Sequence, residues 1–332
     1  MRIKVGTFNV FNLVNAGVKY YNKPAYSKPD FNAKSKWIAA QLKRMEPQIV
    51  GFQEVFHEDA LKHVAKLSGL FEPDSVIAPS ADGTGPSVGL ATTLPIVKQW
   101  DPIKKFPKNS RLSINGKKVP IKSFERPVLK VDLQLDDSHT VTVFVAHLKS
   151  KRPIIDTDNG EDDDDFTTRA VGEARSLIVR AAEAAALRAL LVKEMQDNDQ
   201  PVIVIGDLND AVHSVSTQIV AGSPPWQFLP IDDKRKIWDV LLYNTSEIQS
   251  RQSERDVTYS YVYNGNYHTI DHIFVSQEFH RLNPSRIGKV EFVRFFNDHI
   301  VDGTLSSDNS GRIESDHGQI VATLRLKEDS ND

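Results

Sequence analysis

Two short polar motifs in this chain combine acid, amide and imidazole side chains beside predicted strands. The first, Gly206-Asp207-Leu208-Asn209-Asp210, directly follows the apolar run 202–205. The second, Ser315-Asp316-His317, comes shortly before the apolar run 319–326. A short β-branched run that ends at glycine is typical of a buried strand, and open α/β sheets place their chemistry at strand ends. Both motifs therefore predict a reactive site at the edge of a sheet.

Further polar side chains occupy the same kind of position elsewhere in the chain. An acid or amide after a strand is usually a helix cap or a turn former. One example alone is therefore uninformative, but repetition of acid, amide and imidazole groups indicates a shared site. The further examples are Asn9 after strand 2–8, Gln53 and Glu54 after strand 49–52, His147 after strand 141–146, and Asp271 and His272 at the start of strand 270–275.

These residue types also indicate which metal the site would bind. Glu54 and Asp316 offer hard carboxylate oxygens, which suit Mg²⁺ or Mn²⁺. The chain has no cysteine, which excludes disulfides, thiolate metal sites and cysteine nucleophiles. We therefore expect one or two hard divalent ions, and the sequence does not decide between these numbers.

The predicted elements alternate between strands and helices, but several late strands follow one another directly. This order favours an α/β fold in which two mixed β-sheets pack face to face with helices outside. We expect one domain, 1–326, and a polar C-terminal tail, 327–332, because no Pro/Gly/Ser-rich linker interrupts the chain. The predicted strands are 2–8, 49–52, 88–92, 128–133, 141–146, 202–205, around 258–263, 270–275, 290–295 and 319–326; the predicted helices are 33–45, 58–68 and 169–195, the last with Leu177, Leu187, Leu190 and Leu191 on its apolar side.

Composition limits the function classes further. Net charge is −3 and hydrophobic content is 40%, which are ordinary values for a globular protein. No apolar run is long enough to span a membrane. The N-terminus enters a strand at once, so we expect no signal peptide and a cytoplasmic protein, with a secreted mature form as the alternative. Nothing in the sequence predicts a protein partner, and a monomer is expected.

Two segments carry local charge or aromatic side chains that suit a polyanion. The segment 98–126 is rich in lysine and arginine, and the loop 14–32 places lysines among tyrosines. Either segment suits contact with nucleic acid, and the alternative for each is an ordinary solvated loop. The proposed contacts in the basic segment are Lys104, Lys105, Lys108, Lys117 and Lys118.

The segment 156–165 holds seven acids and superficially resembles a calcium loop. The EF-hand pattern needs acids at fixed positions, and Ile155 and Thr157 occupy two of them. We therefore expect a solvated loop. A structural Ca²⁺ site or an acidic lid that repels wrong substrates are the alternatives.

The polar motifs together resemble the endonuclease/exonuclease/phosphatase superfamily, which has the deoxyribonuclease-I-like fold. The matching segments follow the family's order along nearly the whole chain. They are Thr7-Phe8-Asn9, Gly51-Phe52-Gln53-Glu54-Val55, Phe124-Glu125-Arg126-Pro127, His147-Leu148-Lys149-Ser150, Gly206-Asp207-Leu208-Asn209-Asp210, Ile270-Asp271-His272 and Ser315-Asp316-His317. The string from His147 to Lys151 is similar to bacterial nucleases of the superfamily.

The resemblance implies a four-layer α/β/β/α sandwich and metal-dependent hydrolysis of phosphoesters. It implies that Glu54 holds the metal with Asn9 and Asp316 nearby. Asp207 would orient or deprotonate the attacking water. His147 is the alternative base, and the sequence does not decide between them.

The resemblance assigns the remaining residues to the phosphate and its transition state. Asn209 and Arg126 would contact the phosphate, and Asp271 would orient His317. His317 and His147 would stabilise the pentacovalent phosphorus, which needs positive charge and aligned donors.

The expected function is a nuclease, endo or exo, that cleaves DNA, or RNA, by in-line attack of an activated water. The alternative is a small-molecule or lipid phosphatase or phosphodiesterase, similar to enzymes on phosphoinositides or sphingomyelin. A binding protein on an inactive scaffold is disfavoured because every expected site residue is present.

Overall fold

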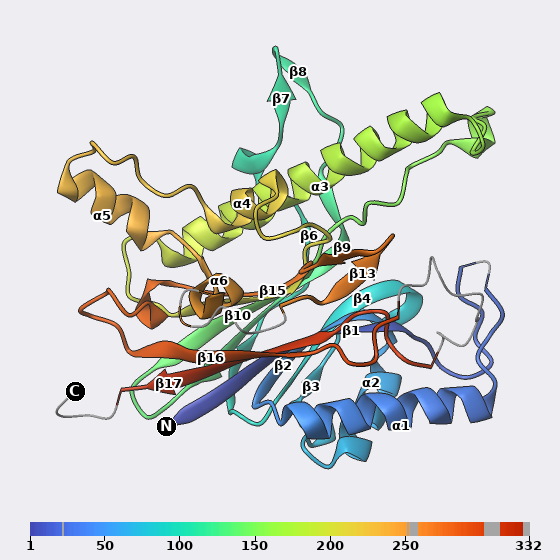
Figure 1. The fold of residues 1–332 in the computed structure, drawn as a ribbon, viewed down its shortest axis with the longest axis horizontal. Coiled ribbons are helices and arrows are strands. Elements are labelled where there is room, and N and C mark those ends of the chain that lie inside the picture. Colours follow the sequence, from blue (N-terminus) through green and yellow to red (C-terminus); the bar gives the residue numbers. More distant parts are fainter. Residues whose placement is uncertain (22, 251, 253–257, 302–312, 328–332) are drawn as a thin grey trace.

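The computed structural model describes residues 1–21, 23–250, 252, 258–301 and 313–327. Two β-sheets lie face to face, with helices on both outer sides (Figure 1). The predicted four-layer α/β/β/α sandwich of two mixed sheets is confirmed. The predicted tail lies outside the described residues apart from Lys327.

The first sheet has six strands and one parallel pair at its centre. Strands β1 and β2 run parallel, and every other neighbouring pair is antiparallel. The strand order is β16 (Gly288–Phe296), β17 (Gln319–Leu326), β1 (Arg2–Leu13), β2 (Ile49–His57), β4 (Asp82–Thr92) and β3 (Val76–Ile77).

The second sheet repeats this arrangement, with β10 and β11 as its parallel pair. Its order is β12 (Tyr243–Asn244), β15 (Asp271–Val275), β11 (Val202–Asp207), β10 (Thr140–His147), β9 (Ser123–Gln134) and β5 (Ile96–Gln99), with β6 (Ile103–Lys105) also paired to β9. Two small hairpins stand apart from the sheets: β7 (Ser113–Ile114) with β8 (Lys117–Lys118), and β13 (Tyr261–Tyr263) with β14 (Asn266–His268).

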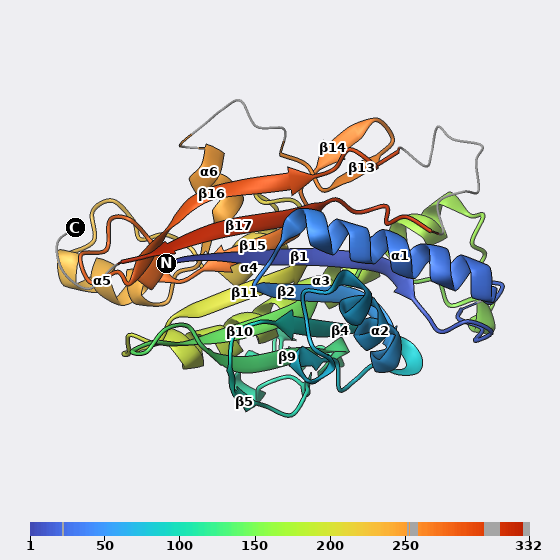
Figure 2. The same ribbon diagram turned by 90° about the horizontal axis from the view of Figure 1, so that it is seen from below.

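Helices cover the outer face of each sheet. Helices α1 (Lys28–Met45) and α2 (Glu58–Ser68) lie over the first sheet, as Figure 2 shows from below. Helices α3 (Phe166–Met195) and α4 (Val215–Ala221) cover the second sheet. Helix α5 (Ile231–Asp239) follows α4, whereas α6 (Thr245–Ser250) lies at the edge between the sheets, where its Ile248 packs against the inter-sheet core. Short 3-10 turns occur at η1 (Pro73–Ser75), η2 (Lys108–Ser110), η3 (Thr157–Asn159) and η4 (Gln277–Phe279).

Alternation along the strands separates the apolar side chains into distinct cores. On β10, Val143 and Val145 point between the sheets, whereas Phe144 and Ala146 point toward α3. The strands read as continuous apolar runs because both of their faces are buried. Each fully buried Val or Phe contributes about 1.5–3 kcal/mol by leaving water. The inter-sheet core therefore fixes how the two sheets sit against each other.

Two predicted helices differ in detail from the structure. Helix α1 begins at Lys28, because the Ser27 hydroxyl accepts the Asp30 N–H and caps a polar first turn that carries no apolar repeat. In α3, Leu177 was predicted to be buried, but it is 48% exposed. The N-terminal half of α3 rises away from the sheets (Figure 1), which leaves this side chain without a sheet to cover it.

Among the described residues, no helix is both long and apolar enough to cross a membrane.

One carboxylate ties α3 and α4 to the loop after β11. Asp210 accepts the Ser216 hydroxyl at 2.6 Å and lies 3.3 Å from both Arg180 Nε and Lys151 Nζ. Burial alone would raise the pKa of Asp210. Hydrogen bonds from Ser216 and Ser214, with the two positive charges, instead lower it to about 2.

We predict that Asp210→Asn lowers the free energy of unfolding by about 2 kcal/mol at neutral pH. The folded pKa of Asp210 lies below its ordinary value of 3.8, so this stabilisation is complete above about pH 4 and falls as the pH drops toward 2. Urea unfolding of both proteins should therefore show a difference that is roughly halved by about pH 3. A difference that stays constant with pH would contradict the assignment.

Gly51 of β2 packs closely against the second sheet. A Cβ atom at this position would lie 2.7 Å from Ile205 Cγ2 and 3.1 Å from Val145 Cγ1. We predict that Gly51→Ala lowers the free energy of unfolding by about 1–3 kcal/mol, because the added methyl overpacks the inter-sheet core.

Gly85→Ala is the matched control, since a Cβ atom there meets nothing within 4 Å. Its unfolding free energy in urea should stay within about 0.5 kcal/mol of the wild type. Equal stability of the two variants would refute the proposed close approach.

Candidate active site

A bulge between β1 and β2 positions the first two candidate residues. Asn9 pairs with Gln53 and Leu13 pairs with Val55, so β1 holds extra residues. Phe11, Asn12 and Glu54 have positive φ angles of 49°, 60° and 62°. Bulky residues adopt this conformation only where the surrounding structure imposes it. The bulge turns the Glu54 side chain into a cavity.

This geometry corrects the predicted ends of the first two strands. We expected β1 to end at Asn9 and β2 to end at Glu54. Both strands continue past these residues, to Leu13 and His57. The bulge interrupts the alternation of side chains, so the pattern in the sequence resembles a strand end.

The second sheet supplies a row of three residues on adjacent strands. His147 pairs with Asp207 across the parallel strands, and Asp207 pairs with Asp271 across the antiparallel ones. The row lies at the carboxyl ends of β10 and β11, the usual location of chemistry in α/β sheets. All three side chains are buried.

Asp207 lies at the centre of the polar cluster. Its Oδ2 atom accepts Asn9 Nδ2 at 3.1 Å and lies 3.5 Å from His147 Nε2 and 3.9 Å from His317 Nε2. Its Oδ1 atom accepts the backbone N–H of Asn209 at 2.8 Å. Residues from both sheets thus converge on one carboxylate.

The two histidines differ in protonation. Burial and the nearby charges of Arg126 and His317 hold the pKa of His147 well below its ordinary value. Burial would also lower the pKa of His317, but the charge and the 2.8 Å hydrogen bond of Asp271, with the charge of Asp207, raise it well above the ordinary range. Near neutral pH, His147 is neutral and His317 is an imidazolium.

Burial, reinforced by the charge of Asp271, raises the pKa of Asp207, and the His317 charge opposes this shift. Such a carboxylate is more basic than an exposed aspartate. A basic carboxylate beside a neutral imidazole is suited to accept a proton near neutral pH.

Glu54 and Asp316 line the same cavity as this cluster and are suited to a divalent ion. Burial and the Asp316 charge raise the pKa of Glu54. Asp316 Oδ1 is buried with no hydrogen-bond partner among the described residues. Two carboxylates at one cavity, one of them with an unused oxygen, fit a hard cation. Asn9 lies beside Glu54, since its Nδ2 is 3.3 Å from Glu54 Oε1, while its Oδ1 accepts the Phe11 N–H.

A second group could also hold an ion. Ligand atoms of Asp207, Asp271 and His317 lie within 4.8 Å of one another. The proton shared by Asp271 and His317 competes with a metal for these atoms. The Glu54–Asp316 pair has no such competitor.

Most of the expected site residues line a cavity of about 1440 Å³, whereas Asn9 and Asp271 lie behind its lining. Its lining contains Glu54, Arg126, His147, Asp207, Asn209, Asp316 and His317 from the expected site. Asn209 has a φ of 56° and donates its Nδ2 to Leu148 O at 3.0 Å. Arg126 Nη1 donates to the same carbonyl at 3.4 Å, while its Nε is buried and finds no partner in the part of the chain that the structure describes.

Most of the positively charged side chains that line this cavity are not among the predicted site residues. Lys151 and Arg152 follow the strand that ends at His147, and Arg169 and Arg180 come from α3. The basic string directly after His147 was a usable signal. The five lysines proposed in the segment 98–126 lie instead on β6, η2 and β8, and none of them lines the cavity.

The tyrosine-rich loop divides between structure and cavity. Tyr20 and Tyr26 are buried and stack against each other at 5.5 Å. Tyr21 and Lys23 line the cavity. His272 has a structural role, since its ring contacts Asn244 Nδ2 and Asp210 O at 3.0 Å and 2.8 Å.

The acidic segment 156–165 is organised by its own hydrogen bonds. Both Glu161 oxygens accept Arg175 at 2.6 Å, and Asp156 accepts Asn159 Nδ2 at 2.7 Å. Asp165 caps α3 through the Thr168 N–H. These bonds use oxygens that a structural Ca²⁺ would need, so the loop supports no calcium proposal.

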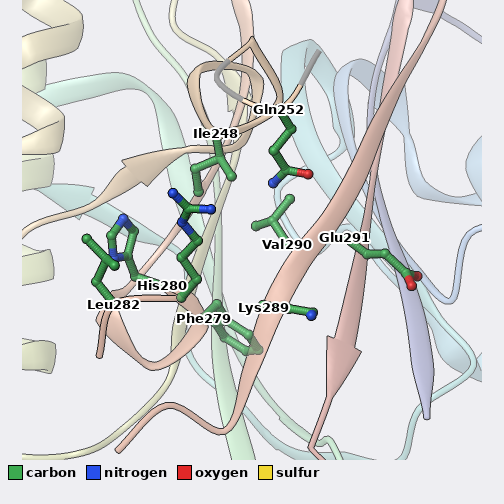
Figure 3. A pocket seen from close by; sticks show the side chains of 9 residues that line it. Ile248, Gln252, Phe279, His280, Leu282, Lys289, Val290 and Glu291 are labelled. Carbon is green, nitrogen blue, oxygen red and sulfur yellow. The ribbon is translucent and has the colours of Figure 1, made fainter. Parts of the chain in front are cut away.

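A smaller cavity of about 350 Å³ lies beside η4 and β16 (Figure 3). Its floor includes the buried Phe279 and Val290. Glu291 points away from the other labelled side chains (Figure 3) and binds Arg2 Nε at 2.6 Å. Among the described residues, this smaller cavity brings together no cluster of acidic and imidazole side chains. The larger cavity is therefore the candidate active site.

Solved structures with this fold span almost the whole chain. Truncated TDP2 from Caenorhabditis elegans is 14% identical with a TM-score of 0.57, over 98% of both chains. D. rerio TDP2 complexed with a single-strand DNA product is 15% identical with a TM-score of 0.55, over 98% of this chain and 99% of that one. The human nocturnin catalytic domain with bound sulfate is 15% identical with a TM-score of 0.54, over 98% and 95% of the chains.

No curated protein sequence matches this chain. The sequence model of the endonuclease/exonuclease/phosphatase family matches residues 6–317. That range includes every polar motif that converges on Asp207 and the Glu54–Asp316 pair. The chain belongs to the endonuclease/exonuclease/phosphatase family.

Proposed function

We propose that this protein is a divalent-metal-dependent phosphodiester hydrolase that acts as a nuclease on DNA. The observation that carries the proposal is the convergence on Asp207 Oδ2 of Asn9, His147 and His317, at 3.1, 3.5 and 3.9 Å. A basic carboxylate, a neutral imidazole and an imidazolium at one point supply both a base and cationic donors. In-line attack of water on a phosphodiester is accelerated by such a base and such donors.

The protonation states suggest a role for each side chain. Asp207 accepts the proton of the attacking water, with His147 as the alternative acceptor. His317, held by Asp271, directs an imidazolium N–H toward the developing charge on phosphorus oxygens. Arg126 and Asn209 face the same cavity and contribute further donors.

Glu54 and Asp316 would hold Mg²⁺ or Mn²⁺. When bound, such an ion supplies Lewis acidity to a phosphate oxygen and lowers the pKa of a water. Without an ion, burial and, after it, the charge of Asp316 raise the pKa of Glu54.

DNA is favoured as the substrate by the cations around the cavity. Lys23, Lys151, Arg152 and Arg169 line it beyond the reacting centre, where they suit the flanking phosphates of a polymer. The D. rerio TDP2 structure holds a single-strand DNA product on this fold. A phosphatase for small phosphoesters or lipids is the alternative.

We predict that hydrolysis of plasmid DNA stops in excess EDTA and returns with Mg²⁺ or Mn²⁺. The reason is the oxygen-only pair of Glu54 and Asp316, which suits hard ions. Gel assays of DNA nicking with and without added ion measure this. Undiminished cleavage in chelator would exclude a metal role.

The isosteric changes Asp207→Asn, His317→Gln and Glu54→Gln should each lower kcat by about 10²-fold or more, because each removes a base, a donor or a metal ligand. Asp132→Asn is the matched control. Its carboxylate binds Trp100 and Thr142 at 2.8 and 2.9 Å, and it does not line the cavity. Near wild-type turnover in any of the three site variants would show that its assigned role is wrong.

The five lysines of β6, η2 and β8 test how far the DNA contact extends. Replacing Lys104, Lys105, Lys108, Lys117 and Lys118 with glutamate should raise KM on DNA and flatten its salt dependence, by about 0.7–0.9 in log–log slope for each lost phosphate contact. Hydrolysis of bis-p-nitrophenyl phosphate should be unchanged, because that substrate reaches only the cavity. Equal losses on both substrates, or none on DNA, would favour the small-substrate phosphatase.

A further inference from the structure

The chain directly after His147 leaves its strand and is held by side chains. The ladder between β9 and β10 ends at the pair Leu129 and Val145. Beyond that pair the two strands separate, and each carries a residue of the site. Arg126 precedes the ladder on β9, and His147 follows it on β10. The distance between these two groups is therefore not fixed by strand pairing.

Glu183 of α3 bridges this gap. Its Oε1 accepts the backbone N–H of Glu125 at 2.8 Å, and its Oε2 accepts the backbone N–H of Lys149 at 2.7 Å. The side chain is fully buried. A single carboxylate thus replaces the missing ladder bonds between the residue before Arg126 and the residue two after His147.

Arg180 holds the backbone carbonyl of the same residue, Lys149. Its Nη1 donates to Lys149 O at 3.2 Å, and its Nε lies 3.3 Å from Asp210 Oδ2. Arg180 is 5% exposed, and Asp210 directly follows Asn209. Arg180 therefore connects the chain after His147 to the loop that carries Asp207 and Asn209.

Arg180 and Glu183 are three residues apart on α3, a spacing that puts both on one face of a helix. We propose that they are positioning residues, which set the place of Arg126 relative to His147 and Asp207, the two residues that strand pairing already joins. The proposal deepens the proposed function and rests on it where turnover is measured. Neither residue need touch the reacting atoms.

Only a carboxylate at position 183 can accept both N–H groups. A glutamine has one acceptor oxygen, and its amide nitrogen would face a second N–H donor. The changed side chain keeps its size and loses its negative charge and one hydrogen bond. Either β9 or the chain after His147 must then move, and small displacements of catalytic groups lower rates strongly.

The experiment compares Glu183→Gln with Glu194→Gln on the same helix. Glu194 is also bonded to strand residues, Lys130 at 2.7 Å and Thr142 at 3.2 Å, but does not line the cavity. With bis-p-nitrophenyl phosphate and saturating Mg²⁺, Glu183→Gln should lower kcat about 10- to 100-fold. Glu194→Gln should keep wild-type kcat, even where its melting temperature falls. Wild-type kcat in folded Glu183→Gln would overturn the proposal.

A second readout uses the metal-free protein without substrate. The ring NMR signals of His147, assigned with His147→Gln, should shift in Glu183→Gln and stay in place in Glu194→Gln. If the wild type hydrolyses no phosphodiester, the proposed function fails, yet these signals still decide the positioning role. Unshifted His147 signals would overturn it.

Arg180→Lys serves if Glu183→Gln does not fold. A lysine keeps the positive charge beside Asp210, but its single nitrogen cannot also reach the Lys149 carbonyl as the guanidinium does. The same loss of kcat and the same shift of His147 are expected. Wild-type values for both would reject the proposal.

Discussion

Four carboxylates gathered in one partly buried space, Glu54, Asp207, Asp271 and Asp316, are the constraint on which the rest of the site depends. Charges of one sign in a poorly solvated space repel, and each is costly unless it is paired. The protein offsets two of them with the His317 imidazolium, which binds Asp271 at 2.8 Å and faces Asp207. The Glu54–Asp316 pair has no comparable cation within bonding distance among the described residues. A divalent ion would balance the cluster.

The backbone accepts strain to assemble this cluster. Glu54 and Asn209 both have left-handed φ angles. The backbone of each residue would have a lower energy in the α or β region of the Ramachandran map. Asn209 is the kind of residue that tolerates this conformation, whereas Glu54 is not. The bulge between β1 and β2 therefore persists because the surrounding layers hold it, and its effect is to aim a carboxylate into the cavity.

The periodicity of apolar residues predicts the regular strands and helices. It does not predict the places where a bulge or a change of direction interrupts that periodicity. Apolar runs such as 202–205 predicted the buried strands, and the motifs around Asp207 and His317 predicted one meeting point. The bulge at Phe11 and Asn12 has no period, so the strand ends were placed too early. The exposure of Leu177 and the placement of Arg169 at the cavity depend on where α3 rises from the sheets. Local periodicity does not contain that information.

The site is also divided between the two sheets, and this links catalysis to packing. Asn9 belongs to the first sheet and Asp207 to the second, yet their side chains bond at 3.1 Å. Among the described residues no strand pairing connects the two sheets, so that distance depends on packing in the inter-sheet core. Hydrophobic burial is non-directional and tolerates small shifts, whereas a hydrogen bond weakens steeply with geometry. A change in the inter-sheet core that costs little stability should therefore cost proportionally more activity, since the sheets can slide while both remain buried.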